Sequence, residues 1–233
     1  MIKAILFDSG RVLNEPVSGH WFIPPNFFKY VDKKTFKSIP ASNRKEAFNR
    51  AGNYINKQKF IFTEEEEYKH FVEYYRILSE QLPRLQLKDS DAKAIAKDMV
   101  YNYDKYSFYE DAIRLIPELS KKYKLAVVTD AWPSLEKVFE KAELRKYFSS
   151  FVISSIKGVT KPNELMYNTA LYELDVLPEE TIFIDDHAKN CDGASSLGIK
   201  PVVLCRNLKE YIYNKLVSTN YDVIRNLDEL KIL

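Results

Sequence analysis

Short apolar runs recur along this chain, and several of them end in Asp, Thr or Ser. They cover residues 3–7, 125–129, 151–153, 181–184 and 201–204. Amphipathic stretches with helical periodicity separate the runs. Continuous apolar strands that alternate with helices are typical of a parallel sheet buried on both faces. We therefore predict an α/β fold with a doubly wound, Rossmann-like parallel sheet.

The order of the strands follows from the way such a sheet is built. The chain builds one side of the first strand and then returns to extend the other side. Applied to the five runs, this rule predicts the order 3-2-1-4-5. A crevice is then expected beyond the carboxyl ends of strands one and four, where folds of this kind bind their ligands.

The interval between the first and second runs is too long for an ordinary connection between a strand and a helix. Residues 15–109 show helix-like patterns and no convincing strand. We predict that this interval is an inserted all-helical cap domain. The α/β core domain then consists of residues 1–14 and 110–233.

A run of four glutamates, residues 64–67, follows Thr63 within this interval. An acidic run of this kind could bind a metal ion. Thr is a good N-cap, and acidic side chains suit the positive end of a helix. We interpret the run as a solvated first helical turn.

Charge and composition narrow the range of partners. The 35 Lys and Arg residues nearly balance the 33 Asp and Glu residues and are scattered among them, so no nucleic-acid partner is expected. Cys191 and Cys205 lack metal-ligand spacing and cannot form a disulfide framework. The first apolar run is too short for a signal peptide or a membrane span. We expect a cytoplasmic protein without membrane contact, either a monomer or a homodimer.

Three carboxylates are expected to converge in the predicted crevice. Asp8 directly follows strand one, and Asp185 and Asp186 directly follow strand four. Any one strand-end Asp is often only a helix cap or a turn former. Three together would repel one another unless a cation lies among them, and oxygen ligands favour Mg²⁺.

Two further segments are expected near these carboxylates. Thr129 ends strand two, so its hydroxyl and the N–H groups of Asp130 and Ala131 are candidates for binding phosphate oxygens. A Thr at this position fits a helix cap equally well. Lys161 precedes Pro162 and a predicted helix, and a proline at a helix start would fix the direction of the lysine side chain.

Four motifs occur in a fixed order along the chain. They are a strand followed by Asp (ILFDSGRVL), a strand ending in Thr (LAVVTDA), a Lys segment (TKPNELMY) and an acidic segment (IFIDDHAKNCDGASSLG). Together they resemble the haloacid dehalogenase-like superfamily, in its subfamily with a helical cap inserted after the first strand. Each motif is weak alone, but all four in order are specific, and the resemblance covers essentially the whole chain.

The resemblance implies a Mg²⁺-dependent hydrolase, a phosphatase that acts on a small phosphate ester through an aspartyl-phosphate. Asp8 would be the nucleophile, and Thr129 would bind the transferring phosphoryl group. Lys161 would neutralise both that group and Asp8. Further candidates for phosphate contacts are the residues that follow Asp8, namely Ser9, Gly10 and Arg11.

The resemblance also implies the ligands of the metal ion. Asp8 would bind it, and the carbonyl oxygen of Gly10 would reach it. Asp186 would be the main ligand from the fourth motif, with Asp185 assisting directly or through water. Asn190 would orient Lys161 or the metal ligands.

One position departs from the pattern of the family's phosphatases. They usually carry a second Asp two residues after the nucleophile, acting as general acid and then as base, and this chain has Gly10 there. General acid–base help is worth roughly 10²–10⁴-fold in rate. Arg11 could compensate for the missing acid by binding an anionic group of the substrate. It could equally be a turn residue whose side chain faces solvent. His20 and His187 lie near the first and fourth motifs in the sequence, and the pKa of an unperturbed histidine suits proton transfer near neutral pH. Nearness in the sequence does not show that either side chain reaches the substrate.

Two alternative functions remain open beside the phosphatase. A 2-haloacid dehalogenase would use Asp8 to attack carbon without a metal, and the Asp185–Asp186 pair argues against it. A binding or regulatory protein with the same fold and poor turnover fits the missing acid at Gly10. A phosphorylated receiver-like domain does not fit the long insertion.

Overall fold

The structure of the protein is a computed structural model that describes residues 1–217 and 221–230. It divides into two compact units. The first, which we call the sheet unit, consists of Met1–Glu15, Phe108–Ala131 and Phe139–Leu233. The second, which we call the helical unit, consists of Pro16–Ser107 and Trp132–Val138. The segment Trp132–Val138 therefore groups with the helical unit, although it lies inside the predicted core range 110–233.

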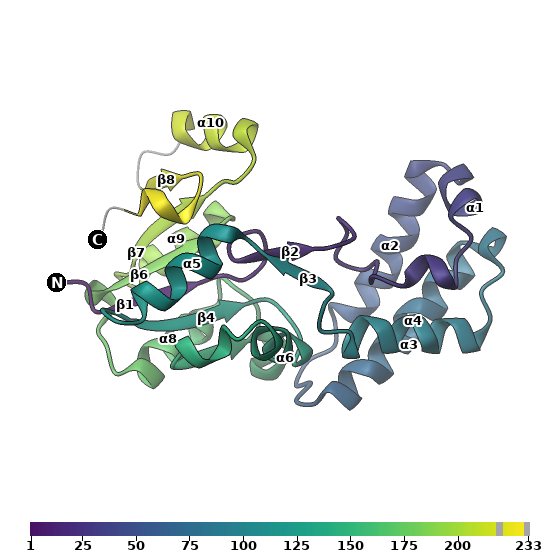
Figure 1. The fold of residues 1–233 in the computed structure, drawn as a ribbon, viewed down its shortest axis with the longest axis horizontal. Helices are drawn as coiled ribbons and strands as arrows, with labels where there is room; N and C mark the ends of the chain where they lie inside the picture. Colours follow the sequence, from purple (N-terminus) through teal and green to yellow (C-terminus); the bar gives the residue numbers. More distant parts are fainter. Residues whose placement is uncertain (218–220, 231–233) are drawn as a thin grey trace. The chain divides into compact units, whose positions relative to one another are not determined.

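The sheet unit is built on six parallel strands in the order β5-β4-β1-β6-β7-β8 (Figure 1). Their bounds are β1 Ala4–Phe7, β4 Lys124–Thr129, β5 Ser150–Ile153, β6 Thr181–Asp185, β7 Lys200–Leu204 and β8 Asp222–Ile224. The α/β, Rossmann-like class is confirmed, and the five predicted strands lie in the predicted order. The five-stranded prediction missed β8, because three residues carry too short a pattern to identify a strand.

Helices and short 3₁₀ turns alternate with the strands in the sequence. They are α5 Glu110–Leu119, α6 Ser134–Lys141, α7 Ser154–Lys157, α8 Glu164–Leu174, α9 Ala188–Ser196 and α10 Leu208–Val217, with 3₁₀ turns η3 Arg145–Tyr147, η4 Pro178–Glu180 and η5 Leu227–Glu229. Alternate strand residues share one face of a sheet. On one face Leu6, Val128 and Phe183 form a buried cluster with Tyr167 of α8 and Ala194 of α9. Buried strands explain why the runs are continuously apolar.

The register of the sheet brings the polar strand ends together. Phe7, the last residue of β1, pairs with Val127 of β4 on one side and with Ile184 of β6 on the other. Asp8 therefore emerges at the same edge at which β4 ends in Thr129 and β6 ends in Asp185. This is the edge of the sheet at which the crevice is predicted.

The helical unit has its own apolar core. Its elements are η1 Phe27–Lys29, α1 Lys33–Ser38, α2 Ala41–Ile55, α3 Glu64–Gln81, η2 Pro83–Leu85 and α4 Asp89–Tyr101. Aliphatic side chains make up most of this core, and its largest fully buried side chains are aromatic, among them Phe71, Tyr74 and Tyr75. Within residues 17–105, all of which the structure describes, no strand occurs. Two short strands, β2 Asn14–Pro16 and β3 Tyr106–Phe108, pair where the chain passes between the units.

The start of α3 agrees only in part with the interpretation of a solvated turn. Thr63 caps the helix as expected, since its hydroxyl accepts a hydrogen bond from Glu66 N at 3.2 Å. Glu67, however, is only 1% exposed. Its carboxylate accepts hydrogen bonds from Ser134 N at 2.8 Å and Ser134 Oγ at 2.6 Å. The interpretation is wrong for Glu67, because a segment far away in the sequence covers it.

None of the described helices combines the length and the apolar character needed to cross a bilayer.

Candidate active site

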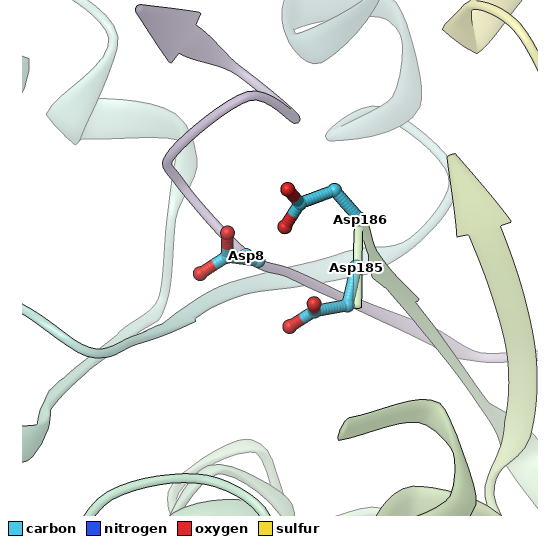
Figure 2. Close-up of side chains that lie close together, drawn as sticks. All are labelled: Asp8, Asp185 and Asp186. Atoms are coloured by element: carbon cyan, nitrogen blue, oxygen red, sulfur yellow. The ribbon is translucent and has the colours of Figure 1, made fainter. Parts of the chain in front are cut away.

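Three carboxylates gather where β1 and β6 end. Asp8 follows β1, Asp185 is the last residue of β6, and Asp186 follows it. One carboxylate oxygen from each lies within 4.8 Å of the others (Figure 2). The strand-end rule therefore predicts a cluster that the structure also brings together.

Lys161 lies between two of these carboxylates. Its ammonium donates to Asp8 Oδ1 and to Asp185 Oδ2, both at 2.6 Å, and its side chain is 1% exposed. Burial alone lowers the pKa of Lys161, but the nearby carboxylates of Asp8, Asp185 and Asp130 outweigh it and raise that pKa. The lysine therefore stays charged and offsets part of the negative charge.

Asp185 is held by several donors. Besides Lys161, its carboxylate accepts hydrogen bonds from His187 N at 2.7 Å and from Asn190 Nδ2 at 3.1 Å to each oxygen. Asn190 thus contacts Asp185, not Lys161. Because both oxygens of Asp185 already have donors, Asp185 is better placed to orient its neighbours than to give a free oxygen to a metal ion.

Asp8 and Asp186 have more free oxygen capacity. In the described part of the chain no hydrogen bond reaches Asp8 Oδ2 or the Asp186 carboxylate. The Arg11 guanidinium lies 3.7 Å from Asp186 Oδ2, and His187 Nε2 lies 3.8 Å from the same oxygen. Burial raises the pKa of Asp8 to about 7, against the opposing effect of Lys161. Burial likewise raises the pKa of Asp186. Closely spaced, desolvated carboxylates with free oxygens suit a hard cation such as Mg²⁺.

The loop after Asp8 is held by hydrogen bonds within itself. Ser9 is buried, and its hydroxyl oxygen accepts a hydrogen bond from Asn14 Nδ2 at 2.7 Å. Gly10 forms an isolated bridge with Asn14. Arg11 has a left-handed backbone with φ of 59° and an exposed side chain. Of the three predicted phosphate contacts in this loop, only Arg11 presents an exposed side chain to a ligand.

The segment after β4 lies beside the lysine. Thr129 is 2% exposed at the end of the strand. The carboxylate of Asp130 accepts a hydrogen bond from Lys161 N at 3.0 Å, and Ala131 N donates to Ser154 Oγ at 3.1 Å. The Ala131 amide would therefore have to exchange this partner before it could bind a phosphate oxygen.

Some residues of the site were not identified from the sequence. Ser154 directly follows β5, so the polar ending of that run was a usable signal. For Asp130 the sequence pointed to the backbone N–H but not to the carboxylate, which accepts a hydrogen bond from Lys161 N. Gly193 of α9 faces Pro162, since a Cβ at Gly193 would lie 2.4 Å from Pro162 Cβ. No sequence pattern predicts that contact.

The histidines differ in position. His187 is exposed at the site, next to Asp186. His20 belongs to the helical unit, where its Nδ1 accepts a hydrogen bond from Phe22 N at 3.2 Å and its ring packs on Phe48 with centroids 4.5 Å apart. Burial lowers the pKa of His20. These contacts give His20 a packing role in its own unit.

Several curated proteins with similar sequences carry phosphatase names. A glyceraldehyde 3-phosphate phosphatase of Pyrococcus furiosus is 30% identical over 52% of this chain and 53% of its own length. A phosphoserine phosphatase of Thermus thermophilus is 28% identical over 58% of this chain and 55% of its own length. The chain thus spans about half the length of these two curated relatives.

Solved structures of similar fold include both phosphatases and dehalogenases. A HAD phosphatase from Thermococcus onnurineus has a TM-score of 0.66 at 21% identity, covering 98% of this chain and 96% of its own. A 2-haloacid dehalogenase from Pseudomonas syringae has a TM-score of 0.64 at 15% identity, covering 99% and 96%. A HAD family enzyme of Bacteroides thetaiotaomicron, solved with magnesium and inorganic phosphate, has a TM-score of 0.59 at 21% identity, covering 87% and 94%. At these identities the likeness shows the fold.

A family model described as haloacid dehalogenase-like hydrolase matches residues 26–204, which include Thr129, Lys161 and the Asp185–Asp186 pair. Asp8 precedes the matched range, and the structure places its carboxylate beside Lys161 and the Asp185–Asp186 pair. The chain belongs to the haloacid dehalogenase-like hydrolase family.

Proposed function

We propose that the protein is a Mg²⁺-dependent phosphatase that hydrolyses a small phosphorylated metabolite through an aspartyl-phosphate at Asp8. The observation that carries the proposal is the position of Lys161, in contact with Asp8 and Asp185 beside the third carboxylate, Asp186. A cation beside a nucleophilic carboxylate favours the approach of an anionic phosphate. The phosphatase names of the curated relatives support the same reaction class.

The first half-reaction transfers the phosphoryl group to Asp8. Asp8 Oδ2, which has no hydrogen-bond donor in the described chain, attacks phosphorus while the bond from phosphorus to the ester oxygen breaks. Lys161 keeps its contact with Oδ1 and offsets the charge of the entering phosphoryl group. The leaving oxygen takes its proton from solvent, because Gly10 offers no acid.

The second half-reaction releases phosphate. A water molecule attacks the phosphorus of the aspartyl-phosphate, and the bond from phosphorus to Asp8 Oδ2 breaks. The water proton passes to solvent, inorganic phosphate leaves, and the Asp8 carboxylate is restored. Lys161 then returns to its shared position between Asp8 and Asp185.

The metal site would use carboxylate oxygens that do not attack phosphorus. Asp186 would bind the ion, Asp8 would bind it through Oδ1, the Gly10 carbonyl would complete the protein ligands, and Asp185 would act mainly by orienting Lys161. Mg²⁺ held by these residues would supply positive charge that offsets the negative charge of the phosphoryl oxygens. Thr129 and Arg11 are the proposed phosphate contacts.

We further propose that the helical unit acts as the cap. It has an apolar core of its own and forms a separate compact unit, which could carry residues for the leaving group. In such enzymes a cap excludes bulk water during the reaction. Substrate choice would then depend on the helical unit more than on the carboxylate cluster.

A panel of phosphorylated metabolites tests this function. The wild-type protein should release inorganic phosphate with Mg²⁺ and lose that activity with a chelator. Asp8→Asn should fold and lose activity, because an amide cannot form the aspartyl-phosphate. Asp192→Asn, which changes an exposed residue of α9, serves as the matched control and should keep activity. Consumption of haloacids alone would instead assign a dehalogenase, and binding of phosphate esters without turnover would assign a binding protein.

A further inference from the structure

The loop that follows Asp8 adopts a conformation that needs support. Arg11 has a left-handed backbone with φ of 59°, which is unfavourable for a residue with a Cβ. Within the loop Leu13 N donates to Ser9 O at 2.8 Å, and Arg11 N donates to Asn14 O at 2.7 Å. A strained backbone persists only where its surroundings hold it in place.

Arg206 supplies that support from a distant part of the sequence. It follows β7, and its guanidinium donates to two carbonyl oxygens of the loop. Nε donates to Arg11 O at 3.2 Å, and Nη2 donates to Val12 O at 2.6 Å. The two bonds hold consecutive carbonyl groups, one of them on the left-handed residue.

Arg206 is itself held firmly. Nη1 and Nη2 donate to Asp111 Oδ2 and Oδ1 at 3.1 and 3.0 Å, which is a two-point contact. The guanidinium also lies over the ring of Tyr109, 3.6 Å from its centroid. The Arg206 side chain is 18% exposed. Asp111 therefore holds one edge of the Arg206 guanidinium, and the Tyr109 ring packs on one face of it. Fixed in this way, the guanidinium can hold the loop in a defined position.

The loop conformation bears directly on the nucleophile. Because a peptide unit is planar and trans, the Gly10 carbonyl points opposite to the Arg11 N–H, whose direction is set by Asn14 O. Any shift of Arg11 would turn that carbonyl and move the backbone that carries Asp8. Small displacements of a reacting group cost large factors in rate.

We propose that Arg206 is a positioning residue for the nucleophile loop, residues 9–14, and that it acts through the carbonyl oxygens of Arg11 and Val12. Its catalytic consequence rests on the proposed phosphatase function. Lysine cannot replace it, because a single ammonium cannot keep the two-point contact with Asp111 while reaching both carbonyl oxygens. The role is separate from that of Lys161, which contacts the reacting carboxylate itself.

Arg206→Met and Arg206→Lys test the proposal, with Arg114→Met as the matched control. Arg114 forms an ion pair with Asp228. Among the described residues, its side chain has no hydrogen bond to the loop of residues 9–14. Three quantities are measured for each protein: amide hydrogen exchange in residues 9–14, kcat and KM on the best phosphate ester, and the urea midpoint. Arg206→Lys keeps a positive charge beside Asp111 and is therefore expected to fold. It tests the proposal even if Arg206→Met does not fold.

Both Arg206 variants should exchange loop amides about tenfold faster than wild type, as expected for the loss of two hydrogen bonds. Their kcat should fall on the order of tenfold to a hundredfold, while KM should change less than about threefold. Arg114→Met should leave loop exchange and kcat as in wild type. Loop exchange or kcat that changes no more in the Arg206 variants than in Arg114→Met would overturn the positioning role. If the wild type hydrolyses no phosphate ester, the proposed function fails, and loop exchange alone decides whether Arg206 holds the loop.

Discussion

At the scale of single residues, the site is governed by one lysine that serves two buried carboxylates. Lys161 reaches both Asp8 and Asp185, and Asp130 fixes its backbone N–H. A buried charge is tolerated only when it is paired and hydrogen-bonded. The position of Lys161 is therefore a sensitive point, and the turn at Pro162 that carries it is backed by Gly193 of α9.

Gly193→Ala is predicted to displace this turn. The new Cβ would lie 2.4 Å from Pro162 Cβ and 3.2 Å from the Tyr167 hydroxyl, so the turn must move. We expect a loss of about 1–3 kcal/mol in unfolding free energy, as for other overpacked sites, together with lower phosphatase activity. Urea unfolding and steady-state kinetics measure both effects.

The control for this substitution is Gly52→Ala. Gly52 lies within α2, and a Cβ there would meet nothing within 4 Å. Alanine should raise stability by about 0.5–1 kcal/mol at this position. A Gly193→Ala protein with wild-type stability and activity would contradict the close approach.

Gly10→Asp is predicted to restore the missing general acid. Among the described residues, the glycines with positive φ are Gly19, Gly158 and Gly198, so the backbone at Gly10 does not require glycine. We expect turnover of alkyl phosphates to rise, up to roughly 10²-fold, with a smaller gain on aryl phosphates, whose leaving groups need less help. A series of substrates with graded leaving-group pKa measures this. Equal slopes of rate against leaving-group pKa in both proteins would contradict it.

At the scale of elements, α3 shows how a remote segment can change the role of a helix turn. Ser134 lies in the segment Trp132–Val138, which groups with the helical unit. It binds the carboxylate of Glu67, and Lys105 donates to Ser134 Oγ at 2.6 Å and to Met99 O at 2.7 Å. Burial raises the pKa of Glu67 and lowers that of Lys105. These contacts fasten the segment after Ala131 to α3.

Glu67→Ala is predicted to destabilise the helical unit. It leaves the Ser134 N–H and hydroxyl without their acceptor in a buried place, which costs about 1–3 kcal/mol for each unsatisfied group. Glu65→Ala, which removes only the exposed pair with Lys69, should cost less than about 1 kcal/mol. Urea unfolding of both variants tests the difference. Equal losses of unfolding free energy in the two variants would mean that the contacts of Glu67 contribute little to stability.

At the scale of the whole molecule, the α/β class and the meeting of Asp8, Asp185 and Asp186 followed from the sequence. An apolar run predicts a buried parallel strand, and the residue after the run predicts which side chain lies at the ligand-binding edge of the sheet. These two features were therefore enough to predict both results. Lys161 was also identified, from its place before Pro162 in the third motif.

The parts that the sequence did not predict depend on side-chain contacts between distant loops. Arg206 lies 195 positions from Arg11, and Ser154 lies 23 positions from Ala131. Neither contact has a periodic or local signature. The grouping of Trp132–Val138 with the helical unit is of the same kind, because it depends on a partner at Glu67.

Mg²⁺ is predicted to stabilise the whole protein by binding the folded state. An ion at 100 times its dissociation constant adds about 2.7 kcal/mol of unfolding free energy. Asp186→Asn should lose most of this gain, because Asp186 presents the free carboxylate of the cluster. Asp192→Asn should keep it. Thermal unfolding with and without Mg²⁺ measures the gain, and an equal Mg²⁺ effect in Asp186→Asn would contradict the proposed ligand.

If Asp8 is the nucleophile, it becomes phosphorylated during turnover, and this species can be trapped. Wild-type protein is mixed with Mg²⁺ and its best phosphate ester, quenched in acid during turnover, and digested for mass spectrometry. We predict one added phosphoryl group on the peptide that contains Asp8, lost on treatment with hydroxylamine and absent from Asp8→Asn. Full turnover by Asp8→Asn, or turnover by the wild type with the phosphoryl group on another residue, would contradict the account.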